Sequence, residues 1–191
     1  FQLAHDSDAF NRWEAGYKLL TKYLLSMIDG KDIAMDDMKK LVAGLRNVLR
    51  DTKLDADFKT MVLALPSEGE LGLAMRASGK LIDIDAIYAA RKKLLLRIAT
   101  ALRADFAATH AQLSKINPMA TDGVTMGKRS LKNLCLGYLA ADENAQTLQQ
   151  VFKQASTAKN MTDQIAALAI LGDTQSPLRI KAFAQFEKRW K

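Results

Sequence analysis

The sequence holds few of the residues that build covalent, metal or catalytic centres. Among its 191 residues there are one cysteine, Cys135, and two histidines, His5 and His110. A single cysteine excludes an internal disulfide and a cysteine zinc cluster. Two distant histidines without an H-E-x-x-H motif do not supply the three ligands of a catalytic zinc site. We therefore assign no catalytic, cofactor-binding or metal-binding residue to this chain.

Other signatures are absent as well. The sequence has no glycine-rich phosphate-binding motif and no nucleophile-elbow serine, which argues against nucleotide and serine-hydrolase chemistry. No apolar run approaches the roughly 18 residues of a membrane-spanning helix. The start, FQLAHDSDAF, lacks the basic and apolar regions of a secretory signal. We expect a chain that does not enter a membrane, and the lone cysteine favours the cytoplasm.

Strand signals are also missing, and the period of the apolar residues is helical throughout. There are only three prolines and ten glycines, and apolar residues recur every three or four positions, as on one face of an α-helix. Helices are predicted at Phe10–Met27, Met35–Leu49, Asp55–Leu65, from Ser67, at Asp83–Ser114, and at about 126–140, 145–158, 163–171 and 177–191. The chain is therefore predicted to be all-α.

Short loops between the predicted helices favour antiparallel hairpins. We expect these hairpins to stack as a right-handed, solenoid-like array of the HEAT or armadillo kind. We treat residues 1–191 as one helical domain, a truncated part of a larger one, with a possible sub-boundary at the 117–125 loop. Gly30 is a predicted helix terminator, Ser67 and Glu70 form a predicted capping box, and Asn144 and Thr162 are predicted caps.

The charge of the chain is basic, with a formal net charge of +7 and a pI near 9.5. A basic balance allows a polyanionic partner, but aromatic residues interleaved for base stacking are missing. We predict ordinary solvated helix faces at the basic clusters, which are Arg91-Lys92-Lys93, Lys128-Arg129-Lys132 and Lys188-Arg189-Lys191. We also predict that His110 is solvated or caps its helix, and that Cys135 is an inert buried thiol.

Several stretches together resemble one family over nearly the whole chain. The most specific is the pairing of R-W-E-A, within FNRWEAGYKLL, with a later N-M-T-D. The segments that carry the resemblance are Phe10–Leu20, Leu63–Glu68, Leu131–Ala140, Asn160–Leu171 and Phe186–Trp190. They resemble the carboxy-terminal helical domain of bacterial aminopeptidase N, a gluzincin zinc metallopeptidase. Tyr17 departs from the family, which has glutamine there.

The resemblance implies a parent enzyme that removes single residues from peptide amino termini. It places the zinc and the catalytic residues on a preceding domain, so none of them transfers to a position of this sequence. It implies that this chain caps the catalytic domain of the same polypeptide and encloses a cavity for peptide substrates. The parent is expected to be monomeric and to bind neither nucleic acid nor membrane.

Two other functions stay open at this point. The chain could be an independent helical adaptor that binds a partner helix or peptide along a hairpin groove. It could also be a basic helical module that binds nucleic acid, which a steep dependence of binding on salt would reveal. If the chain is a truncated part of a larger domain, its last helix is expected to expose an apolar patch of side chains that lack partners on one side, namely Phe183, Phe186 and Trp190.

Overall fold

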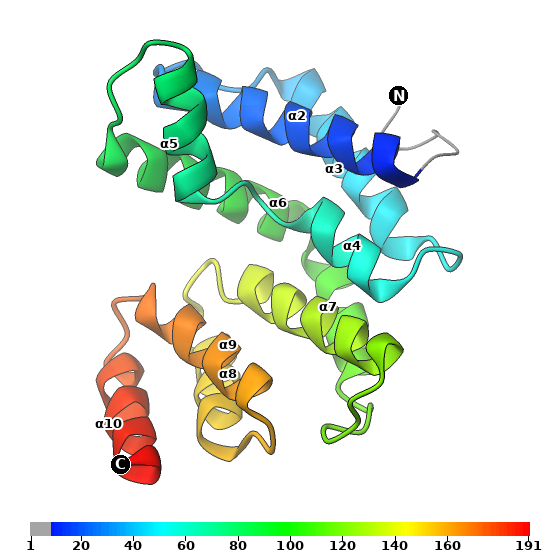
Figure 1. The fold of residues 1–191 in the computed structure, drawn as a ribbon, viewed down its shortest axis with the longest axis vertical. Coiled ribbons are helices and arrows are strands. Elements are labelled where there is room, and N and C mark those ends of the chain that lie inside the picture. The colour runs from blue at the N-terminus through cyan, green and yellow to red at the C-terminus, as the bar shows by residue number, and fades with distance from the viewer. Residues whose placement is uncertain (1–8) are drawn as a thin grey trace. The chain divides into compact units, whose positions relative to one another are not determined.

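The computed structural model describes residues 9–191, and the regular elements in this range are all α-helices (Figure 1). The all-α prediction is therefore confirmed for the described residues. In chain order the helices are α2 (Ala9–Ile28), α3 (Met35–Arg50), α4 (Ala56–Leu63), α5 (Glu68–Ala77), α6 (Ile84–Leu113), α7 (Gly123–Leu139), α8 (Ala145–Thr157), α9 (Met161–Gly172) and α10 (Leu178–Trp190).

The chain divides into two compact units, one up to Asp105 and one from Phe106 to Lys191. The division lies within α6 and not in the 117–125 loop that the sequence favoured as a sub-boundary. No helix among the described residues is both long enough and apolar enough to cross a membrane.

The first unit packs α2 against α4 and α5, and α3 against α4 (Figure 1). Each helix contributes one apolar stripe to the core, because residues three and four apart lie on the same side of a helix. The fully buried aliphatic side chains include Leu20, Leu24, Leu41, Leu45, Leu63, Leu71, Leu94 and Ile98. Salt bridges from α3 to the end of this unit add to the packing: the guanidinium groups of Arg46 and Arg50 both contact the carboxylate of Asp105.

The second unit is built on α7, α8, α9 and α10, with α8 packed against α9 and α10 packed against both. Its core joins buried residues of all four helices, including Leu136, Leu148, Val151, Leu168, Leu171 and Ala182. Phe106, at the end of α6, stacks on Tyr138 of α7 with ring centroids 4.4 Å apart and an interplanar angle of 5°. Phe106 is 0% exposed and Tyr138 is 2% exposed, so this ring pair forms a second centre of the unit's interior.

Side-chain caps fix several helix starts. The predicted capping box is confirmed: the backbone N–H of Ser67 donates to the Glu70 carboxylate at 2.7 Å, and the Glu70 N–H donates to the Ser67 hydroxyl at 3.2 Å. Asn144 caps α8 as predicted. The prediction for Thr162 is wrong, because the side chain of Asn160 accepts the N–H of Asp163 at 2.8 Å and starts α9 two positions earlier.

Gly30 ends α2 in the left-handed region, with φ of +77°. A Cβ added there meets no neighbouring atom within 4 Å, so the cost of Gly30→Ala is the backbone strain alone, about 1 kcal/mol of stability. Gly69→Ala is the matched control, since its Cβ also meets open space but its φ is helical. We expect urea unfolding to show a lower free energy of unfolding for Gly30→Ala than for the wild type, and an unchanged free energy for Gly69→Ala. Equal effects would contradict the role of φ at Gly30.

Candidate functional site

A buried carboxylate organises the polar interior of the second unit. Asp163, on α9, is 4% exposed. Its side chain accepts hydrogen bonds from Lys132 Nζ at 2.7 Å, Asn133 Nδ2 at 2.9 Å and Asn160 Nδ2 at 3.0 Å. Lys132 and Asn133 lie on α7, so the cluster ties α7 to the start of α9. We call these four residues the Asp163 cluster.

The cluster extends into α8 and into the loop before α7. Gln154 of α8 donates from Nε2 to Asn133 Oδ1 and to the backbone carbonyl of Asp163, both at 2.9 Å. Asn160 Nδ2 also donates to the carbonyl of Pro118 at 2.9 Å. Arg129 donates to the same carbonyl at 3.1 Å and to that of Ala120 at 2.8 Å. Three helices and one loop are thus held by one polar network.

The electrostatics of Asp163 follow from these partners. Burial acts to raise the pKa of the carboxyl group, but hydrogen bonds from Lys132, Asn160 and Asn133 outweigh it, and the pKa is lowered from its ordinary value. The carboxylate is therefore charged and paired at neutral pH. Every oxygen of the group has a donor, which is the arrangement of a structural ion pair and leaves no open position for a reacting molecule.

His110 lies near this cluster and differs from its prediction. It is half-buried, whereas the sequence predicted a solvated or capping residue. Its pKa is lowered, chiefly because burial disfavours the imidazolium and also because the Lys132 charge opposes it, with Asp163 acting in the other direction. The sequence could not show this burial, because His110 belongs to the second unit together with Lys132 and Asp163, which come later in the chain.

The prediction of solvated faces is also wrong for part of the basic clusters. Arg129 is 7% exposed and Lys132 is 9% exposed, because both donate to partners inside the second unit. Arg91 is half-buried and donates to the carbonyl of Pro66 at 2.8 Å. The cluster at Lys188 and Arg189 is exposed, as predicted. Buried guanidinium and ammonium groups cannot reach a phosphate backbone, which removes Arg129 and Lys132 from any nucleic-acid interface.

Cys135 behaves as the sequence predicted. Its side chain is 0% exposed, and burial raises the pKa of the thiol to about 12. Since the thiolate is the reactive form, Cys135 is an inert packing residue on α7. Groups of three or more His, Cys, Asp or Glu side chains that could hold a metal do not occur in the part of the chain that the structure describes, and His5 lies outside that part.

The R-W-E-A segment lies in α2 and makes structural contacts. Arg12 is 9% exposed and its guanidinium lies 3.8 Å from the carboxylate of Asp51. Trp13 stacks on Tyr17 with centroids 5.6 Å apart. The Tyr17 hydroxyl donates to Glu70 of α5 at 3.2 Å, and burial together with the Glu70 charge raises the pKa of Tyr17. Tyr17 thus links the middle of α2 to the first turn of α5.

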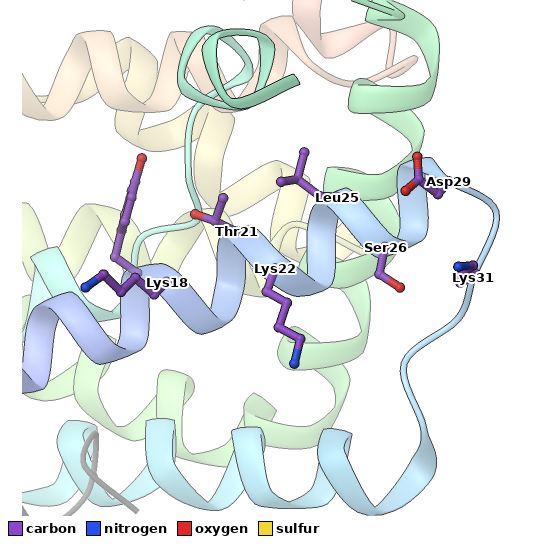
Figure 2. Close-up of a pocket in the computed structure, with 8 residues that line it drawn as sticks. Lys18, Thr21, Lys22, Leu25, Ser26, Asp29 and Lys31 are labelled. Carbon is purple, nitrogen blue, oxygen red and sulfur yellow. The ribbon is translucent and has the colours of Figure 1, made fainter. Parts of the chain in front are cut away.

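A hollow of about 510 Å³ runs along the outer face of α2 (Figure 2). It is lined by Tyr17, Lys18, Thr21, Lys22, Leu25, Ser26, Asp29 and Lys31. A second hollow, of about 560 Å³, lies between α3 and α6 and is almost wholly apolar. Neither hollow contains a histidine, a cysteine or a pair of neighbouring carboxylates, so both offer binding surfaces rather than acid–base chemistry.

Comparison with known proteins defines the class of this chain. Residues 1–191 match the family described as "Domain of unknown function (DUF3458_C) ARM repeats", and the chain belongs to this family. The description agrees with the predicted stacking of helical hairpins. The match covers the whole sequence and therefore both compact units.

The relatives point to one kind of protein. The chain is 32% identical over 186 residues to the aminopeptidase N of Caulobacter vibrioides, 97% of this chain and 21% of that protein. It is 31% identical to the Haemophilus influenzae aminopeptidase N, over 95% of this chain and 20% of the relative. It is 28% identical to that of Escherichia coli, over 100% of this chain and 22% of the relative. The chain spans about a fifth of their length.

A solved structure supports the same fold. The crystal structure of Legionella pneumophila aminopeptidase A in complex with aspartic acid matches 99% of this chain and 22% of its own, with a TM-score of 0.80 and 21% sequence identity. The chain thus corresponds to the carboxy-terminal helical domain of aminopeptidase N, and the resemblance carried by the sequence motifs is confirmed. The comparisons give no support to the adaptor or nucleic-acid alternatives.

Proposed function

We propose that this chain is the non-catalytic helical segment of a zinc-dependent aminopeptidase that removes amino-terminal residues from peptides. The observation that carries the proposal is the 32% identity to an aminopeptidase N over 97% of this chain. The described residues do not fit a zinc site, because no three potential ligands come together among them. We place the zinc and the reacting groups on a catalytic domain elsewhere in the same polypeptide, which we propose to be cytoplasmic and monomeric.

The role proposed for the segment is a stiff wall that caps the catalytic domain and borders a cavity for peptide substrates. The Asp163 cluster supports this role, since a paired carboxylate with three donors fixes α7 against α9. A wall of fixed shape limits which molecules reach the cavity, and exclusion of bulk water strengthens the electrostatic interactions inside it. Solvated lysines that face the cavity would attract the terminal carboxylate of a peptide.

The test compares the full-length polypeptide with this chain alone. We expect the zinc-loaded full-length protein to hydrolyse alanine p-nitroanilide and short peptides, and a chelator to abolish the reaction. The 191-residue chain is expected to show no hydrolysis with or without added zinc. Hydrolysis by the isolated chain would overturn the assignment, and so would a full-length protein without peptidase activity.

A further inference from the structure

The hollow on α2 is a groove between two rows of side chains. Tyr17, Thr21 and Leu25 are spaced four residues apart, and Lys18, Lys22 and Ser26 form the parallel row. Figure 2 shows Thr21 and Leu25 projecting from one side of α2 and Lys22 and Ser26 from the other. Rows at a spacing of four are the ridges between which a second helix lays its own ridge.

The end of the groove is closed by the turn after α2. Gly30 takes a positive φ, and the backbone N–H of Lys31 then donates to the carbonyl of Ser26 at 2.9 Å. This hydrogen bond brings Lys31 back beside the last turn of the helix. The groove therefore has basic side chains at Lys18 and Lys22 along its length and at Lys31 at its far end.

The nearby carboxylates already have partners, and one of these partners is Lys18 of the groove itself. Glu14 contacts Lys18 at 2.9 Å in an exposed pair, Asp29 accepts from Lys80 at 2.6 Å, and Glu70 accepts from Ser67 and Tyr17. Within the described residues, Lys22 and Lys31 have no carboxylate partner. The groove thus has positive charge left over at Lys22 and Lys31, beside the apolar side chain of Leu25.

We propose that this groove binds an acidic, amphipathic helix of a partner polypeptide. One carboxylate of the partner would meet Lys22, and a second would meet Lys31. An apolar residue between them would cover Leu25. A nucleic acid fits less well, because Tyr17 is the one aromatic residue among those that line the groove and Trp13 already covers one face of its ring, so no row of rings is present on which successive bases could stack. The proposal does not depend on the aminopeptidase assignment.

The experiment titrates this chain into a fluorescein-labelled helical peptide of about 20 residues, with glutamate at every fourth position and leucine on the same face. Fluorescence anisotropy is expected to show binding that weakens as salt is added. The double variant Lys22→Glu, Lys31→Glu should weaken binding by about tenfold or more, since two attractions become repulsions. Lys153→Glu, an exposed change on α8, should change it less than about twofold.

A second probe and a second readout separate the outcomes. The same peptide with glutamine in place of glutamate should not bind measurably, and a single-stranded RNA should bind no better to the wild type than to the double variant. In the variant Ser26→Cys the bound peptide should slow alkylation of the introduced thiol, because Cys135 is buried and does not react. Equal binding by the double variant and Lys153→Glu, or by the glutamine peptide, would overturn the proposal.

Discussion

Substitution of Asp163 by alanine is expected to destabilise the second unit by about 3–5 kcal/mol, the usual loss when one partner of a buried ion pair is removed. The change leaves Lys132 Nζ, whose side chain is 11% exposed, without the carboxylate that it contacts at 2.7 Å. It also removes the acceptor of Asn133 and Asn160. Urea unfolding followed by circular dichroism measures the loss.

The double variant Lys132→Met, Asp163→Asn is the control for this prediction. It removes both charges, keeps an amide oxygen as acceptor, and leaves no buried ammonium group unpaired, so it should lose less than half as much stability. If Asp163→Ala costs less than about 1 kcal/mol, the cluster does not hold the unit together.

The same cluster gives a pH dependence. The pKa of Asp163 is lower in the folded chain than its ordinary value, so the unfolded chain binds a proton that the folded chain does not. The stabilisation by this group is present above the ordinary pKa of aspartate, about 4, and is lost as pH falls below it. In Asp163→Asn the free energy of unfolding should change less than in the wild type between about pH 6 and about pH 3, a range that spans the ordinary pKa of aspartate.

Substitution of Phe106 by alanine is expected to lower the free energy of unfolding by about 3–5 kcal/mol. The ring is fully buried, so its removal leaves a cavity and exposes the face of Tyr138 that it covers at 4.4 Å. The offset stacking of two rings adds about 0.5–1.5 kcal/mol to the area that they bury. The loss should appear in urea unfolding of the whole chain.

Phe183→Ala is the matched control for Phe106→Ala. The Phe183 ring is 46% exposed on α10, so truncation removes less buried area and should cost less than half as much. A similar loss at both positions would contradict the view that the Phe106–Tyr138 pair forms a centre of the interior.

Much of the fold follows from the sequence because each helix has its own apolar stripe and punctuation. The exact start of a helix is harder to predict where two neighbouring residues could each act as the cap. Asn160 precedes α9 and caps it, because its side chain accepts the N–H of Asp163 and also reaches the Asp163 carboxylate, whereas Thr162 lies within the first turn of the helix. The predicted start of this helix, at about residue 126, is three residues late: α7 begins at Gly123, because Asp122 caps it by accepting the N–H of Thr125 at 2.9 Å.

The polar interior could not be predicted in the same way. Lys132 and Asn133 are adjacent on α7. Their burial depends on the carboxylate of Asp163, which lies 31 residues after Lys132 in the chain. Two signals were present in the sequence: polar residues between Leu131 and Leu134 on an apolar stripe, and the spacing of Asn160 and Asp163. The predicted apolar face of α10 is correct for Phe183 and Trp190, but Phe186 packs against the core.

The two tryptophans stand in different halves of the chain. Trp13 stacks on Tyr17 in the first unit, while Trp190 in the second donates from Nε1 to Gln164 at 3.1 Å. Each indole therefore emits from its own surroundings, and replacing either one by phenylalanine leaves a single tryptophan. The melting of each half can then be watched on its own, without any attached dye.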